Sequence, residues 1–191
     1  MSGISKRNQI ISAADQLFYQ QGYEHTSFAH IAEVIKISRG NFYYHFKTKD
    51  EILDEVINYR LTNTQALLDQ WVMDGETPAN RIRSFINILI VNRAKIKHFG
   101  CPVGTLTSEL TKLNHTAQED ANKIFTLFRI WLKNQFKQLG HNKSADELAM
   151  HLLARSQGVA TLASAFNDEK FIKQEVKRLH EWLAQYTDNA A

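Results

Sequence analysis

The sequence contains one cysteine and two prolines in 191 residues, and it has no long apolar run. With Cys101 as its single cysteine the chain cannot form an internal disulfide, which fits a reducing cytosol. The first thirty residues include Lys6, Arg7 and Asp15 and no apolar run of the signal-peptide type, and no segment approaches 18 uninterrupted apolar residues. We therefore expect a cytoplasmic protein that does not associate with a membrane.

The chain also lacks a strong excess of charge of either sign. Its net charge is +3 with the histidines neutral, and residues 1–50 hold six lysines and arginines against four acidic residues. So mild an excess does not indicate nucleic-acid binding by itself. Any surface that binds nucleic acid must therefore come from the local arrangement of a few side chains.

Motifs for catalysis and metal binding are missing as well. The eight histidines are scattered without metal-ligand spacing, and no phosphate loop or dinucleotide fingerprint is present. Cys101 with His98 or His115 is the best nucleophile–base pair, but no third group stands at motif spacing to orient it. Glu109 and Glu119 look like ordinary helix residues. We therefore expect no enzyme, no metal site and no cofactor.

Helical patterning runs through nearly the whole chain. Both prolines follow a residue suited to begin a helix, in Thr77-Pro78 and Cys101-Pro102, and no stretch alternates long enough for a strand. The pattern predicts an all-α fold of about nine helices. They are expected over residues 5–21, 26–35, 38–46, 48–71, 78–99, 102–113, 117–139, 144–166 and 168–186.

The three short N-terminal helices differ from the longer ones that follow. A tight turn at Lys36-Ile37 joins the second to the third, which is the layout of a helix-turn-helix. No linker, repeat or low-complexity segment interrupts the rest. We predict an N-terminal helix-turn-helix domain over residues 1–50 and a C-terminal helical domain over residues 51–191.

Residues 38–51, SRGNFYYHFKTKDE, contain two helix starts ten residues apart. Ser38 and Thr48 are N-cap residues, and Glu51 completes a capping box with Thr48. The short helix between the two caps carries long or flat hydrogen-bond donors. Phosphates and base edges are bound by such side chains.

Gly40 and Lys49 are unusual at their positions. Glycine inside a helix costs about 1 kcal/mol relative to alanine, so a close approach of a partner to the backbone would explain Gly40. Lys49 stands at the positive end of the fourth helix, where a bound phosphate would explain it and a solvated lysine is the alternative. A purely structural role for the protein would not explain why Gly40 and Lys49 occupy these positions.

Residues 26–52, TSFAHIAEVIKISRGNFYYHFKTKDEI, resemble the DNA-binding signature of TetR-family transcriptional repressors. The resemblance covers about the first fifty residues, and the remainder is similar only in length and helical content. It implies a homodimeric repressor that binds double-stranded operator DNA and is released by a small-molecule inducer. The DNA contacts that it implies come from Thr26, Ser27, Arg39, Gly40, Asn41, Tyr43, Tyr44, His45 and Lys49.

The last two predicted helices have features of a dimer interface. The first of them is rich in small residues, and the second has apolar residues at 4-3-4 spacing. In the family that the chain resembles, the last two helices form a four-helix bundle between subunits, while packing inside one chain is the alternative. The predicted dimer contacts are Gly158, Leu162, Ile172, Val176, Leu179 and Leu183.

The C-terminal body holds enough aromatic side chains to line an apolar cavity, which is typical of small-molecule sites. Cys101 stands just before a helix start, where a thiolate is stabilised, and the Gly100-Cys101 step resembles electrophile-sensing repressors of the family. A small buried packing residue is the alternative for this cysteine. The predicted ligand-binding residues are Trp71, Phe85, Leu89, Cys101, Phe128 and Trp131.

Overall fold

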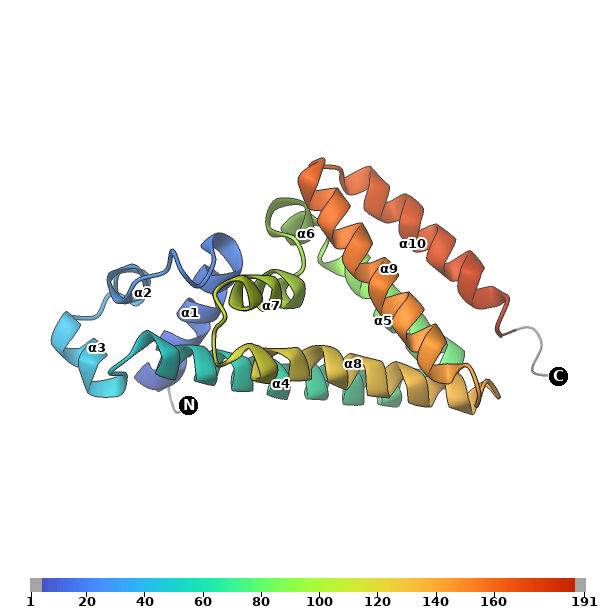
Figure 1. Ribbon diagram of the computed structural model, residues 1–191, viewed down its shortest axis with the longest axis horizontal. Coiled ribbons are helices and arrows are strands. Elements are labelled where there is room, and N and C mark those ends of the chain that lie inside the picture. The colour runs from blue at the N-terminus through green and yellow to red at the C-terminus, as the bar shows by residue number, and fades with distance from the viewer. Residues whose placement is uncertain (1–4, 188–191) are drawn as a thin grey trace. The chain divides into compact units, whose positions relative to one another are not determined.

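The computed structural model describes residues 5–187, and within that range the chain is helical and has no strand. The all-α prediction is confirmed (Figure 1). The helices are α1 (Lys6–Gln21), α2 (Phe28–Ile35), α3 (Arg39–His45), α4 (Lys49–Asp74), α5 (Pro78–Val91), α6 (Arg93–Phe99), α7 (Pro102–Lys112), α8 (Gln118–Gln138), α9 (Ala145–Ala165) and α10 (Glu169–Ala184). No helix in the described range is long and apolar enough to cross a lipid bilayer.

Asn92 divides the helix that was predicted over residues 78–99 into α5 and α6. Its backbone N–H and its side-chain amide both donate to the carbonyl of Ile88, the side chain at 3.0 Å. A side chain that competes for backbone carbonyls in this way disfavours a continuous helix. The sequence pattern missed this break because the residues on both sides of Asn92 keep a helical period.

The chain forms two compact units. The first consists of Met1–Asn63 and Thr105–Lys123, and the second of Thr64–Gly104 and Ile124–Ala191. We call them the N-terminal unit and the C-terminal unit. Helices α4, α7 and α8 each begin in one unit and end in the other. The division does not coincide with the predicted split near residue 50, because α7 and the turn after it pack with the N-terminal helices.

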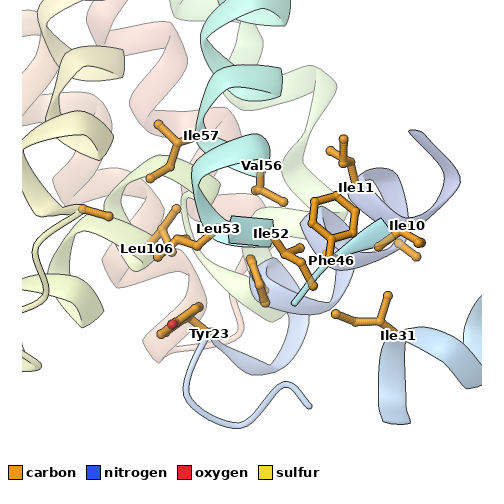
Figure 2. Packing of buried hydrophobic residues seen from close by; sticks show 14 of the residues in the cluster. Ile10, Ile11, Tyr23, Ile31, Phe46, Ile52, Leu53, Val56, Ile57 and Leu106 are labelled. Atoms are coloured by element: carbon orange, nitrogen blue, oxygen red, sulfur yellow. The ribbon is translucent and has the colours of Figure 1, made fainter. Parts of the chain in front are cut away.

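The core of the N-terminal unit joins α1, α2, α3, the first half of α4, and α7 (Figure 2). Phe42 and Phe46 hold α3 in place, since each is only 1% exposed. Residues Leu106 and Leu110 of α7 are buried in the same cluster. The helix-turn-helix is therefore packed around one apolar core to which a distant part of the sequence contributes.

Local signals set the ends of the first three helices. Ser5 caps α1 by accepting a hydrogen bond from the amide of Asn8, and Gly22 ends that helix with φ +90°. Ser27 caps α2, which ends at Lys36 in the left-handed conformation. The sequence placed the start of α1 one residue early, at Ser5, and the start of α2 two residues early, at Thr26.

In the C-terminal unit, α10 packs against α5, α6 and α9. The apolar residues at 4-3-4 spacing on α10 are buried inside this unit and do not form an exposed seam for a second copy. Packing within one chain is the alternative that this burial favours, and the predicted dimer contacts of these four residues stay a prediction. These residues are Ile172 (0% exposed), Val176 (5%), Leu179 (1%) and Leu183 (0%).

Phe46→Ala tests the packing of the N-terminal unit. Deleting this buried ring should lower the free energy of unfolding by about 3–5 kcal/mol, because it leaves a cavity under α3. Val34→Ala is the control, since Val34 is 53% exposed and its loss should change stability by less than about 0.5 kcal/mol. Urea unfolding measures both variants, and equal effects would contradict the packing described here.

Candidate nucleic-acid interface

Helix α3 is a short element held firmly at both ends. Ser38 Oγ accepts a hydrogen bond from the amide of Asn41 at 3.3 Å. After the helix, Thr48 Oγ1 accepts from the amide of Glu51 at 3.1 Å. Glu51 reaches back to the amide of Lys47 at 2.7 Å, one residue before the cap that was expected to receive it. Both predicted caps therefore form, the second with a shift of one residue on its return bond.

The outer face of α3 is exposed. Tyr43 is 48% exposed and Tyr44 is 79% exposed, unusually high values for large aromatic side chains. Arg39, Gly40 and Asn41 are exposed as well, and His45 is half-buried beside Tyr44. This surface offers a guanidinium, an amide and two phenols from a rigid helix.

Gly40 has no role inside the fold. A Cβ atom added at this position would meet nothing within 4 Å, and the backbone is not in the left-handed region that favours glycine. The helix would accept alanine there and would be more stable for it. The absence of a side chain leaves the backbone open to approach from outside.

Helix α2 supplies the neighbouring part of this surface. Ser27 is exposed at its N-terminus, and the ring of Phe28 lies 4.8 Å from the ring of Phe42 and 5.4 Å from that of Tyr43. These ring contacts fix the direction of Tyr43. Between the two helices runs a groove of about 350 Å³, lined by Ser27, Phe28, Ala29, Ala32, Arg39, Phe42 and Tyr43.

Two residues predicted to contact DNA are turned toward the protein. Thr26 is 1% exposed, and its hydroxyl donates to the carbonyl of Gly22 at 2.7 Å. The ammonium of Lys49 donates to the carbonyls of Tyr23 and Glu24 at 3.1 and 3.2 Å, and it lies 4.2 Å from the centre of the Tyr23 ring. The direct phosphate contacts expected of Thr26 and Lys49 stay predictions. In this structure both side chains bond to the turn between α1 and α2.

Glu109 on α7 binds the same turn, and this role was missed from sequence. Its two carboxylate oxygens accept hydrogen bonds from the backbone amides of Tyr23 and Glu24, each at 2.9 Å. A Cβ at Gly22 would come within 2.9 Å of the carboxylate, so the glycine leaves room for it. Because 85 residues or more separate the partners, no local pattern could have indicated the contact.

Tyr23 connects this turn to α4 and to His115. Its hydroxyl donates to Asp50 Oδ1 at 2.5 Å and lies 3.3 Å from His115 Nε2. Burial and the bond to Asp50 raise the pKa of the Tyr23 phenol. The hydrogen bond from Tyr23 lowers the pKa of the Asp50 carboxyl, despite an opposing effect of desolvation.

Four of the six predicted ligand-binding residues form one aromatic cluster in the C-terminal unit. The ring of Trp71 lies 5.6 Å from that of Trp131 and 6.4 Å from that of Phe85, which in turn lies 5.5 Å from Phe128. Leu89 is buried on α5. Cys101 is partly buried at the start of α7 and accepts a weak hydrogen bond from the amide of Gly104 at 3.5 Å.

The two remaining dimer candidates lie on an exposed part of α9. Leu162 is 45% exposed, and Gly158 is exposed in open space, since a Cβ added there would meet nothing within 4 Å. Ala154, Met150 and Phe166 are exposed on or next to the same helix. The described residues contain no group of three or more histidine, cysteine or acidic side chains that could hold a metal.

Two family models match this sequence. Residues 10–56 match the model described as bacterial regulatory proteins of the tetR family. Residues 78–177, just over half of the chain, match the C-terminal domain model of LmrA/YxaF-like transcriptional regulators. The chain belongs to the TetR family of transcriptional regulators. This is a class of DNA-binding proteins and not of enzymes, as the sequence predicted.

Relatives of the TetR-family chain include an uncharacterized HTH-type transcriptional regulator from Lactococcus lactis subsp. lactis. It is 30% identical over 63% of this chain and 62% of its own length, so the match spans less than two thirds of that relative. The transcriptional repressor DhaR from Mycobacterium sp. is 20% identical over 96% of this chain and 94% of its own. A TetR regulator structure from Legionella pneumophila superposes with a TM-score of 0.84 at 26% identity, covering 97% and 98% of the two chains.

Acid should weaken the link between Tyr23 and Asp50. Because the folded-state pKa of Asp50 is lowered, its contribution to stability is present above the unfolded pKa of about 4 and is lost as the pH falls through the folded value. Tyr23→Phe removes that contribution. The difference in unfolding temperature between wild type and Tyr23→Phe should therefore shrink from pH 7 to pH 3.

Tyr59→Phe is the matched control for this pH series. Tyr59 is 41% exposed on α4, so loss of its hydroxyl should change the unfolding temperature little at any pH. A difference between wild type and Tyr23→Phe that stayed constant down to pH 3 would exclude the proposed coupling to Asp50.

Proposed function

We propose that this regulator is a ligand-responsive repressor whose operator contacts lie on the exposed face of α2 and α3. The observation that carries the proposal is Gly40, a glycine inside a helix whose absent side chain faces open space. Glycine at this position makes the helix less stable than alanine would. Next to two exposed tyrosines, this open backbone is suited to approach the floor of a DNA groove.

The residues of this face divide by chemistry. Arg39 and Asn41 can bond base edges in the major groove, with the Gly40 backbone close to them. Phosphates can accept hydrogen bonds from the hydroxyls of Ser27, Tyr43 and Tyr44 and from the ring of His45. Such phosphate contacts fix the register of the protein on the DNA duplex. Thr26 and Lys49 act indirectly, because they fix the turn that leads into α2.

A second copy is needed to read two half-sites. We propose that it packs on the exposed side of α9 near Gly158 and Leu162, where small side chains let another helix approach closely. Helix α10 packs against α9, and its residues Ile172, Val176, Leu179 and Leu183 are buried within the unit.

The inducer is proposed to bind at the aromatic cluster of Trp71, Phe85, Phe128 and Trp131. An apolar, aromatic molecule suits such a wall. Electrophile sensing at Cys101 remains the second form of this proposal, supported by the partly buried thiol at a helix start.

A path for the signal is given by the chain itself. Helix α4 (Lys49–Asp74) begins after α3 and includes Trp71, and α7 (Pro102–Lys112) begins directly after Cys101 and includes Glu109. A ligand that favours one conformation of the C-terminal unit can therefore bias the DNA-reading turn through either helix.

Gly40→Ala tests the DNA-reading role, because stability and affinity should change in opposite directions. The variant should be more stable by up to about 1 kcal/mol, since alanine favours the helix. Its affinity for the operator should fall on the order of tenfold, as for the loss of a base-specific contact. Thermal unfolding and fluorescence anisotropy with DNA from upstream of the gene measure the two effects.

Ala66→Gly is the control for stability alone. This residue is exposed on α4, so the change lowers helix stability and should leave operator affinity unchanged. If Gly40→Ala bound operator as tightly as wild type, the groove approach would be wrong.

A further inference from the structure

Arg7, near the start of α1, contacts residues from two other parts of the N-terminal unit. Its guanidinium nitrogen Nη2 donates a hydrogen bond to Glu55 Oε1 on α4 at 3.0 Å. The central carbon of the same guanidinium lies 4.7 Å from the centre of the Phe46 ring. Phe46 is the residue that ends α3. One side chain therefore links α1, α4 and the end of α3.

The position of α3 depends on Phe46. This residue is 1% exposed, and its backbone N–H donates to the carbonyl of Phe42 as the helix ends. Figure 2 shows its ring among apolar side chains that include Ile10 and Ile11 of α1. Helix α3 has only seven residues, so a small shift of Phe46 would change the direction of the whole exposed face.

The two contacts of Arg7 suit a guanidinium in particular. A guanidinium is planar, so its face can lie over an aromatic ring while its edge donates to a carboxylate. An ammonium is a compact charge and has no such plane. The hydrogen bond from Arg7 lowers the pKa of the Glu55 carboxyl, against an opposing effect of desolvation, so the carboxylate is charged at neutral pH.

An arginine in the DNA-binding unit could instead bind a phosphate of the operator. The contacts of Arg7 argue against that role, because its charge is already compensated by Glu55 and one side of its guanidinium is turned to Phe46. Arg39 on α3 is different. It is exposed and has no acidic partner in the part of the chain that the structure describes.

We propose that Arg7 is a positioning residue for operator binding. It does not contact DNA. It fixes the direction of α3 by holding the Phe46 ring from one side, and Glu55 holds the guanidinium in place. This inference rests on the proposed function, since it takes the exposed face of α3 as the operator surface.

Glu55→Gln tests the role most sharply, because the two roles of Arg7 predict effects of opposite sign. The variant removes a negative charge from the DNA-binding unit, and a free Arg7 that binds phosphate would then bind operator more tightly. If Arg7 positions α3, operator affinity should instead fall about threefold to tenfold, on the scale of one charge-assisted hydrogen bond. Fluorescence anisotropy with the full-length protein measures the affinity at several salt concentrations.

Two changes at Arg7 itself separate charge from shape. Arg7→Lys keeps the charge and loses the plane that lies over Phe46, so operator affinity should fall about as far as in Glu55→Gln. Arg7→Gln should weaken binding without changing the slope of log affinity against log salt concentration. A direct phosphate contact would tolerate lysine, and its loss would flatten that slope by ~0.9.

Asp54→Asn is the matched control, since Asp54 is exposed on α4 directly before Glu55. Its side chain has no hydrogen-bond partner among residues 5–187, so the variant loses the same charge without losing a contact. Operator affinity should be unchanged or higher. Because ion pairs this exposed contribute little to stability, all four variants should be folded at the assay temperature, which circular dichroism checks.

The inference would be overturned by operator binding in Glu55→Gln or Arg7→Lys that is as tight as in wild type, or by a flatter salt slope in Arg7→Gln. Gly40→Ala, measured on the same DNA, tests the proposed function separately. Weaker binding in the Arg7 and Glu55 variants with no effect of Gly40→Ala would support the positioning role and reject the groove approach of α3. The opposite pattern would reject the positioning role alone.

Discussion

The turn between α1 and α2 is the constraint on which the proposed DNA-binding surface of α2 and α3 depends. The carboxylate of Glu109 accepts hydrogen bonds from the backbone amides of Tyr23 and Glu24. The ammonium of Lys49 donates hydrogen bonds to the backbone carbonyls of the same two residues. A carboxylate and an ammonium thus bond the backbone N–H and C=O groups of two consecutive residues. Tyr23 is tied to Asp50 as well. These hydrogen bonds fix the position at which α2 begins. Because α2 is joined to α3 by a short turn and packs against it, they also position α3.

This arrangement explains why the N-terminal unit includes residues from the middle of the chain. A helix-turn-helix of three short helices has few buried side chains of its own. Helix α7 adds Leu106 and Leu110 to the core and Glu109 to the turn. The exposed face of α3 is therefore not needed for packing. Its tyrosines, arginine and glycine can serve to bind a partner.

The sequence predicted what local chemistry determines. The caps at Ser38 and Thr48 and the turn at Lys36 all act within a few residues, and their patterns were recognisable. The exposed face of α3 followed from helical spacing around Phe42 and Phe46. The family resemblance supplied the interpretation of that face as a DNA contact surface, which the spacing alone does not give.

The sequence failed where partners are distant or where one pattern fits two environments. The hydrogen bonds that Glu109 accepts from the α1–α2 turn join residues about 85 positions apart. A lysine at position 49 gives the same sequence pattern whether its ammonium binds a phosphate or a backbone carbonyl. The apolar stripe of α10 suits a subunit interface and an internal one equally well, and here it is internal. The pairing of Arg7 with Glu55, 48 positions away, has no local signature in the sequence either.

Hydrogen exchange at the amides of Tyr23 and Glu24, with operator affinity measured on the same samples, tests whether the Glu109 carboxylate holds the α1–α2 turn for operator binding. In Glu109→Gln, a neutral amide replaces the carboxylate that both amides bond. We expect both amides to exchange faster than in wild type and operator affinity to fall with them, whereas Glu119→Gln should change neither. Faster exchange at both amides with unchanged operator affinity would contradict this role of the carboxylate.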